Sequence, residues 1–354
     1  MNQTNRRRFL GTLAGAPFLS IRTRRSWGAE FGGNGCADRR QELLAKMELV
    51  MGPFPRQKRK PPLDVKTLES IDLPTHTRAS ITFVSEEGDP VPAYLLLPKK
   101  SQGPAAAMLC LHQTTRLGAG EPAGVGGDAN LHYAQELAER GYVTIAPDYP
   151  DLPLTPGFGG YRFDAYRHGY ASNTMKGIWN HTRAVDLLES LPAVDAERIG
   201  CIGHSLGGHN TLFAGAFDQR LRVLVTSSGF TSFAKYYGGE LCGWSQLRYM
   251  PLIATQYHDN PNEMPFDFSD VLAALAPRPV FINAPLRDDN FDFTGVDDVV
   301  RTVIAACPGE FGTGGRLVVK HPDAPHSFPP EVRQEAYAFL DKWLRHKSRG
   351  AGAA

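Results

Sequence analysis

The chain has 354 residues, of which 42% are hydrophobic and 21% charged, so it can build a packed core and is neither disordered nor a coiled coil. Its 38 Lys and Arg residues nearly balance 37 Asp and Glu residues, which disfavours a nucleic-acid partner. No apolar run approaches the roughly 18 residues of a membrane-spanning helix, so we expect no stable membrane anchor in the mature protein. Five cysteines do not indicate a disulfide framework.

An arginine-rich segment opens the chain. Three arginines at positions 6–8 precede Phe9 and Leu10, and a short apolar stretch, diluted by Gly and Ala, follows. This pattern resembles a twin-arginine export signal. We therefore predict a signal over residues 1–30 and a periplasmic or secreted protein; a basic tail without a targeting role is the alternative.

The next elements form an N-terminal lead-in and a strand pair. Residues 38–51 place apolar side chains at helical spacing, and prolines follow this helix. We assign residues 31–78 to this helix and a Pro-rich lead-in, and residues 79–354 to a single domain. Residues 79–84 and 91–97 predict an antiparallel strand pair at a sheet edge.

From residue 105 onward, predicted strands and helices alternate. The strands are residues 105–111, 143–147, 198–202, 221–226, 279–284 and 316–320. The helices are residues 131–140, 174–191, 206–217, 296–306 and 331–346. This alternation predicts an α/β fold, with a mainly parallel sheet and helices on both faces. Residues 114–128 and 230–268 interrupt the pattern just after strands, where such sheets bind ligands, and we predict that the second stretch is a small cap.

Residues 203–207 read Gly-His-Ser-Leu-Gly, a G-x-S-x-G motif between a predicted strand and a predicted helix. In this setting the serine stands on a sharp turn with no room for a side chain at either glycine. The turn puts Ser205 at a helix N-terminus, where backbone N–H groups and the helix dipole favour negative charge. We predict that Ser205 is a nucleophile; a glycine-rich helix cap with an ordinary serine is the alternative.

A nucleophilic serine needs a base and an orienting carboxylate. We predict that His326, in the loop after the last strand, is the base, with His321 as the competing residue. The acid should follow the strand 279–284, where Asp288 comes first and Asp289 is the alternative.

The developing oxyanion needs two N–H donors. We predict that Leu206, the residue after the nucleophile, and Gln113, in the loop after the strand 105–111, supply them. Thr114 is the second choice in that loop, and His112 is expected to shape the loop.

These motifs resemble the α/β-hydrolase superfamily, in its dienelactone hydrolase and acetyl xylan esterase-like branch, over residues 79–346. The resemblance rests on residues 112–114, 203–208, 288–289 and 325–328. It implies an eight-stranded, mostly parallel sheet and a Ser-His-Asp ester hydrolase that uses no cofactor. Dienelactone hydrolases often carry cysteine as the nucleophile, so Ser205 shifts the expectation toward carboxylic or carbohydrate (acetyl-type) esters.

Other patterns carry less weight. Residues 118–123 match a loose dinucleotide motif, but Pro122 lies where a helix should start. No H-E-x-x-H motif or Cys/His cluster occurs, so we predict no metal. Cys110 and Cys201 lie in predicted strands and are expected to be buried thiols.

The cap stretch is rich in aromatic residues, whose faces suit both acyl groups and sugars. We predict that Trp244 and Tyr237 contact the substrate, with Tyr161 on the opposite wall. The alternative is that these rings only pack the cap onto the domain.

The sequence thus predicts an exported serine ester hydrolase that acts on a small-molecule or carbohydrate ester through an acyl-enzyme. A serine peptidase of the same fold is one alternative. The other is a catalytically inactive homologue that binds a glycan or a protein partner.

Overall fold

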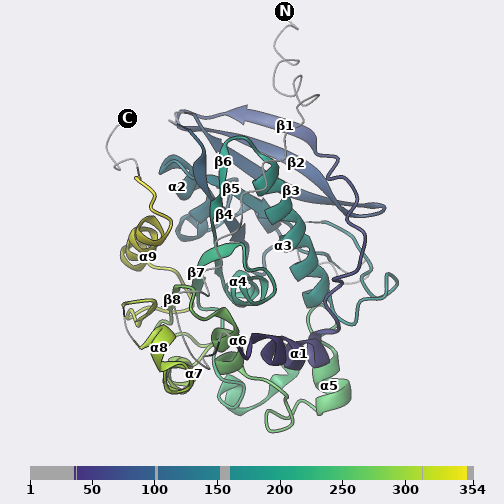
Figure 1. The fold of residues 1–354 in the computed structure, drawn as a ribbon, viewed down its shortest axis with the longest axis vertical. Helices are drawn as coiled ribbons and strands as arrows, with labels where there is room; N and C mark the ends of the chain where they lie inside the picture. The colour runs from purple at the N-terminus through teal and green to yellow at the C-terminus, as the bar shows by residue number, and fades with distance from the viewer. Residues whose placement is uncertain (1–35, 37, 100–102, 152–159, 313, 349–354) are drawn as a thin grey trace, which may run out of the picture. The chain divides into compact units, whose positions relative to one another are not determined.

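The core of the molecule is one nine-stranded sheet in the computed structural model, which describes residues 36, 38–99, 103–151, 160–312 and 314–348 (Figure 1). The strand order is β1-β2-β3-β5-β4-β6-β7-β8-β9. The antiparallel side holds β1 (Lys66–Asp72), β2 (His76–Glu86) and β3 (Asp89–Pro98), and β3 pairs antiparallel with β5 (Val143–Pro147). The parallel side holds β4 (Ala105–Leu111), β6 (Val194–His204), β7 (Leu221–Ser227), β8 (Val280–Asn283) and β9 (Leu317–Lys320). The predicted mostly parallel sheet is confirmed.

The sheet has one strand more than the eight predicted. The additional strand is β1, which pairs antiparallel with β2 at the sheet edge. All seven of its residues are exposed, so the sequence shows no apolar alternation there. Backbone pairing with β2, and not burial of side chains, therefore makes this segment a strand. The stretch assigned to the Pro-rich lead-in thus contributes to the sheet.

Helices cover both faces of the sheet, as predicted (Figure 1). One buried cluster joins α1 (Arg40–Met51), α3 (Asn173–Ser190), α4 (Leu206–Phe217), α6 (Phe268–Leu275) and α7 (Phe293–Ala306) to Ala107, Leu109 and Leu111 of β4. A second cluster joins α2 (Tyr133–Glu139) and α9 (Pro330–Trp343) to Ala106, Met108 and Cys110. Alternate residues of β4 thus enter two cores, which explains its continuous apolar run. Within the described residues, no helix is long and apolar enough to cross a membrane.

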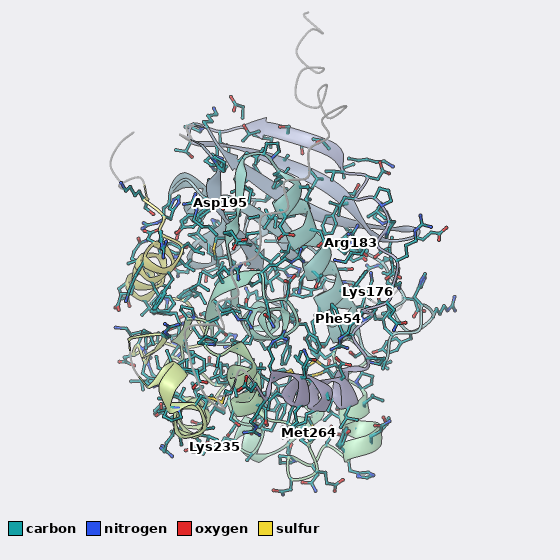
Figure 2. The ribbon with its side chains drawn as sticks, in the orientation of Figure 1. Phe54, Lys176, Arg183, Asp195, Lys235 and Met264 are labelled. Atoms are coloured by element: carbon teal, nitrogen blue, oxygen red, sulfur yellow. A yellow bond between two sulfur atoms is a disulfide. The ribbon has the colours of Figure 1, made fainter. Side chains whose placement is uncertain are left out.

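The N-terminal helix α1 belongs to the same core as the sheet. Its apolar face is buried, and Lys46 Nζ lies 3.4 Å from Asp270 Oδ1 on α6. After the helix, the Phe54 ring lies 6.0 Å from the Trp179 ring of α3 and 5.3 Å from the Phe217 ring of α4 (Figure 2). The described residues belong to one compact unit, and the predicted export signal lies outside them.

Lys176 of α3 is the centre of a buried ionic cluster (Figure 2). Its side chain is 0% exposed, and Nζ lies 2.5–2.8 Å from oxygens of Asp89, Asn180, Glu86 and Ser85. We call these five residues the Lys176 network. Burial lowers the pKa of Lys176, although both carboxylates oppose this shift. The network ties α3 to the hairpin formed by β2 and β3.

One disulfide joins distant parts of the chain. Cys36 and Cys307 are bonded across 271 positions, with their Cα atoms 5.6 Å apart. The sequence did not predict this pair, because neither cysteine belongs to a spacing motif. Cys110 and Cys201 are buried free thiols, as predicted.

Candidate active site

Ser205 stands on a sharp turn between β6 and α4. Its φ of 54° and ψ of −119° lie in a region that residues other than glycine rarely adopt. Its N–H donates to the Ser227 carbonyl on β7 over 2.8 Å, and its carbonyl accepts from the N–H groups of Gly208 and His209. These bonds hold the strained backbone and place Ser205 at the N-terminus of α4, where the helix dipole favours negative charge.

The two glycines of the motif leave room for this turn. A Cβ atom on Gly203 would overlap the backbone of Gly207. A Cβ atom on Gly207 would overlap the carbonyl of Leu111 at the end of β4. The G-x-S-x-G spacing therefore follows from close packing of the turn against β4 and against itself.

His326 and Asp288 meet in the loops that follow β9 and β8. His326 Nδ1 lies 2.9 Å from both carboxylate oxygens of Asp288. An ionised carboxylate only accepts hydrogen bonds, so Nδ1 carries the proton and Nε2 of the neutral ring does not. The His326 side chain is 22% exposed and the Asp288 side chain 1%, so the imidazole is the accessible half of the pair.

The surroundings of Asp288 favour its charged form. Burial raises the pKa of this carboxyl, but the hydrogen bond and charge of His326 lower it. The backbone N–H groups of Asn290 and Phe291 also donate to Asp288, over 2.9 and 3.0 Å. Together these interactions hold the pKa of Asp288 below its usual value, so the group is ionised at neutral pH.

The two competing residues lie elsewhere. His321 Nδ1 is 2.7 Å from the Ala284 carbonyl, and Nε2 is 3.0 Å from Asp297 of α7. Both ring nitrogens of His321 are therefore engaged away from Asp288. Asp289 is exposed to solvent.

Polar residues that the sequence analysis did not single out link the serine turn to the histidine loop. Asn283, the last residue of β8, donates to Ser227 Oγ over 2.8 Å and to the Ser327 carbonyl over 2.9 Å. His204 Nδ1 lies 2.9 Å from the same Ser227 Oγ, and burial lowers the pKa of His204 to about 3. The neutral His204 ring lies 4.8 Å from the His326 ring. No motif marks Asn283 or Ser227; the available signal was a polar side chain ending an apolar strand.

The two predicted oxyanion donors lie at the ends of neighbouring strands. Leu206 opens α4 directly after the serine, and Gln113 follows β4. The Gln113 side chain donates to Glu121 over 2.9 Å, and its carbonyl accepts from His112 Nδ1 over 2.6 Å. Burial lowers the pKa of His112 to about 4, and its other nitrogen accepts from the Tyr149 N–H over 3.3 Å. His112 thus shapes this loop, as expected.

The three aromatic residues predicted to contact substrate have different surroundings. Trp244 is 4% exposed and packs among phenylalanine rings. Tyr161 is 6% exposed and donates to Asp89 over 2.6 Å. Trp244 and Tyr161 are therefore packing residues, which was the alternative to substrate contact. Tyr237 is 57% exposed and donates to Asn290 over 3.0 Å, beside the loop that carries the acid.

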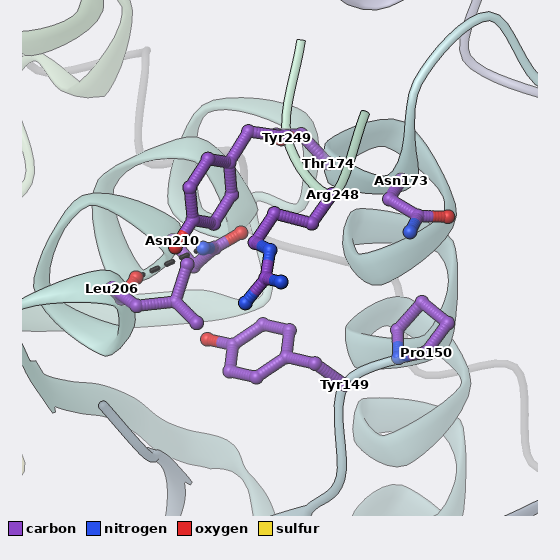
Figure 3. Close-up of a pocket in the computed structure, with 8 residues that line it drawn as sticks. All are labelled: Tyr149, Pro150, Asn173, Thr174, Leu206, Asn210, Arg248 and Tyr249. Atoms are coloured by element: carbon purple, nitrogen blue, oxygen red, sulfur yellow. Dashed lines mark hydrogen bonds between the residues drawn. The ribbon is translucent and has the colours of Figure 1, made fainter. Parts of the chain in front are cut away.

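A small cavity of about 10 Å³, enough for about one water molecule, lies beside the serine turn (Figure 3). Its lining comes from the end of β5, the start of α3, α4 and the cap stretch: Tyr149, Pro150, Asn173, Thr174, Leu206, Asn210, Arg248 and Tyr249. Among the described residues, no three His, Cys, Asp or Glu side chains gather as a metal site would need.

Comparison with known proteins relates this fold to carbohydrate esterases. The family described as "Glucuronyl esterase, fungi" matches residues 157–306. A solved glucuronoyl esterase from Solibacter usitatus has a TM-score of 0.66 and 21% identity, covering 86% of this chain and 92% of that chain. Acetyl xylan esterase 1 from Thermoanaerobacterium has a TM-score of 0.58 and 16% identity, covering 88% and 96%. The chain has the α/β-hydrolase fold of these esterases.

Two relatives by sequence add to this likeness. The Bacillus subtilis protein YtaP is 27% identical over 327 residues, which are 87% of this chain and 99% of that protein. The 4-O-methyl-glucuronoyl methylesterase of Hypocrea jecorina is 25% identical over 53% of this chain, and the chain spans 45% of that enzyme. The predicted fold and the predicted class, a carboxylic ester hydrolase, are confirmed. The glucuronoyl esterases are a likeness that the motifs did not single out.

Proposed function

We propose that the protein is an exported serine ester hydrolase in which Ser205, His326 and Asp288 form a catalytic triad. The observation that carries this proposal is the contact of His326 Nδ1 with both oxygens of the buried Asp288, beside the strained serine turn. The His326 contact and two backbone N–H groups favour an ionised Asp288 although burial opposes it, and the same contact leaves Nε2 of His326 for the role of base.

The reaction would proceed through an acyl-enzyme. Ser205 Oγ attacks the ester carbonyl while His326 Nε2 takes its proton, and Asp288 stabilises the imidazolium. The N–H groups of Leu206 and Gln113 donate to the oxyanion, and His326 then protonates the leaving alcohol. Water, activated by the same imidazole, releases the acid. Losing one oxyanion donor in such a site typically costs about 100–1,000-fold in rate.

The substrate class we propose is a carbohydrate ester, either of a uronic acid or of an O-acetylated sugar. The family match over residues 157–306 and the folds of the glucuronoyl and acetyl xylan esterases support this class.

Export is supported by a separate feature. The bond between Cys36 and Cys307 is of the kind that persists in oxidising compartments and is rare in the cytosol. Together with the arginine motif at positions 6–8, it favours a periplasmic or secreted protein.

A fluorophosphonate probe tests the triad directly, because it labels only an activated serine. We expect the folded protein to be labelled, and Ser205→Ala to lose both the label and at least about 1,000-fold of its ester hydrolysis without a change in melting temperature. Ser190→Ala, an exposed serine at the end of α3, is the matched control and should keep both. Labelling with cleavage of peptides but not esters would favour the peptidase; no label and no hydrolysis would favour the inactive homologue.

A further inference from the structure

Three polar residues end three neighbouring strands of the parallel side of the sheet (Figure 1). His204 ends β6, Ser227 ends β7 and Asn283 ends β8. The backbone register pairs His204 with Ser227, and Ser227 with Asn283. Residues in register point their side chains to the same face of a sheet, so these three form one row. We call it the strand-end row; in the chain, its members come just before the serine turn and the acid loop.

Asn283 joins the strand-end row to the loop of His326. Its Nδ2 donates to Ser227 Oγ over 2.8 Å and to the Ser327 carbonyl over 2.9 Å. A carbonyl oxygen only accepts hydrogen bonds, so the amide must turn its nitrogen, and not its oxygen, toward Ser327. Both N–H groups of the amide are thus used, one toward β7 and one toward the residue after the proposed base. These two bonds tie the histidine loop to the edge of the sheet.

The strand-end row also contacts the backbone of the serine turn. The Ser227 carbonyl accepts from the Ser205 N–H over 2.8 Å, and Ser227 Oγ lies 2.9 Å from His204 Nδ1. The His204 ring in turn lies 4.8 Å from the His326 ring. Two hydrogen-bonded side chains, Asn283 and Ser227, therefore connect the backbone of the proposed nucleophile to that of the proposed base.

Asn283 is not the residue that stability alone would favour at this position. It is 1% exposed, and its Oδ1 has no hydrogen-bond partner among the described residues. A buried acceptor without a partner costs free energy, which an apolar side chain of the same shape would avoid. The other residues of β8, at positions 280–282, are buried and apolar. Core packing therefore does not explain the amide, whereas a role in placing the histidine loop does.

We propose that Asn283 is a positioning residue that holds the His326 imidazole over the serine turn. The inference rests on the proposed ester hydrolysis and adds a residue to it. In that reaction His326 Nε2 must reach Ser205 Oγ, and a misplacement of about 1 Å at such a site can cost about 100-fold in rate. Asn283 takes no part in proton transfer and acts only through the position of the His326 loop.

Asn283→Leu tests this role, because leucine has nearly the shape of asparagine but no hydrogen-bonding group. We expect kcat for 4-nitrophenyl acetate to fall about 10- to 100-fold, with KM within about two-fold of the wild-type value. Labelling by a fluorophosphonate should slow by a similar factor, since it depends on the same base. Asn283→Ala, too short to reach either partner, should give the same losses and replaces the leucine variant if that one does not fold.

The matched control is Thr144→Val on β5. It removes a hydroxyl that donates to the Ala134 carbonyl over 3.0 Å at a 0% exposed position, so it also deletes a buried hydrogen bond of the sheet. Both rates should stay at the wild-type value in this variant. Thermal melting of each variant verifies folding.

A second background separates positioning of the base from a general disturbance of the site. In His326→Ala no imidazole is left to position, so adding Asn283→Leu should lower the residual hydrolysis by less than about two-fold. A general disturbance would instead lower it by the same factor as in the wild-type background. That result would overturn the positioning role.

Solvent exchange of the His326 Nδ1 proton, measured by proton NMR of the resting protein, is independent of turnover. It should be about ten-fold faster or more in Asn283→Leu, because the ring is held less firmly against Asp288. Unchanged kcat, labelling and proton exchange in a folded Asn283 variant would overturn the positioning role and leave the hydrolase standing. No hydrolysis and no labelling by the wild type would overturn the proposed function, while proton exchange would still decide whether Asn283 holds His326.

Discussion

Two buried carboxylate clusters, one beneath the β2–β3 hairpin and one beyond β8, use similar chemistry to different ends. In the Lys176 network, the cation is 0% exposed and four side-chain oxygens surround it. In the pair of His326 and Asp288, the acid is equally buried, but the base is 22% exposed. The first cluster keeps its cation wholly buried, although Glu86 also contacts Lys58, whose side chain is 30% exposed. In the second cluster only the acid is buried. The imidazole of His326 is partly exposed, so one of its nitrogens is available to react.

The comparison teaches how to separate structural from catalytic charges. The loss of one charge from a wholly buried cluster leaves the other charges without a partner, so it should appear in the free energy of unfolding. A cluster with one exposed member can present that member to a reactant, so the loss of the cluster should appear in kcat. Three experiments test this distinction.

The largest effect is expected at the pair of His326 and Asp288. Asp288→Asn removes the charge that fixes the His326 tautomer and should lower kcat by about 10,000-fold, with little change in melting temperature. Asp289→Asn, at the exposed neighbour, is the control and should behave as wild type. Steady-state kinetics on an aryl ester measure both. A greater loss in Asp289→Asn would reverse the assignment of the acid.

Removing the cation of the Lys176 network should lower the stability of the protein. Lys176→Met leaves Asp89 buried without its cation and Glu86 with Lys58 alone, and breaking a buried pair typically costs about 3–5 kcal/mol of unfolding free energy. Urea unfolding measures this loss, and kcat per folded molecule should stay near the wild-type value. Lys66→Met is the control, because that side chain is 67% exposed. A Lys176→Met protein that keeps its stability but loses its activity would contradict the structural role of the Lys176 network.

The smallest effect concerns buried imidazoles. Burial, reinforced by His112, lowers the pKa of His181 to about 3, below its ordinary 6.5. The unfolded state then binds the additional proton below pH 6.5, so stability is complete above that pH and falls as the pH drops toward 3. The slope for one such group is about 1.4 kcal/mol per pH unit.

Urea unfolding between pH 7.5 and 5 should therefore show stability falling with acid, and His181→Leu should make the slope shallower by that amount. His168→Leu replaces an exposed histidine and is the control. Equal slopes in wild type and His181→Leu would mean that folding does not lower the pKa of His181.

The parts of the fold that the sequence predicted well are those whose residues carry their own signal. β4 and β5 end where predicted because their apolar runs end there, and α4 begins at Leu206 because the glycine motif fixes the turn. β1 was missed because its exposed residues carry no alternation, and pairing with β2 makes it a strand. α6 was missed although Asp267 and Asp270 form a capping box before its apolar face.

The site was predictable only where chemistry imposes a motif. Ser205 and His326 follow from spacing and chain order. Asn283 could not be found this way, because its position depends on which loops the sheet brings together. The same holds for the disulfide, whose cysteines become neighbours only after folding.

That disulfide also decides which pieces stay together if the backbone is cut. A single proteolytic nick anywhere between Cys36 and Cys307 leaves one covalent molecule, with the nucleophile and the acid on linked fragments. A nick after Cys307 does not, because β9, the loop of His326 and α9 lie beyond the linked portion. The covalent closure therefore protects two members of the proposed triad, and the third is retained only by packing and hydrogen bonds.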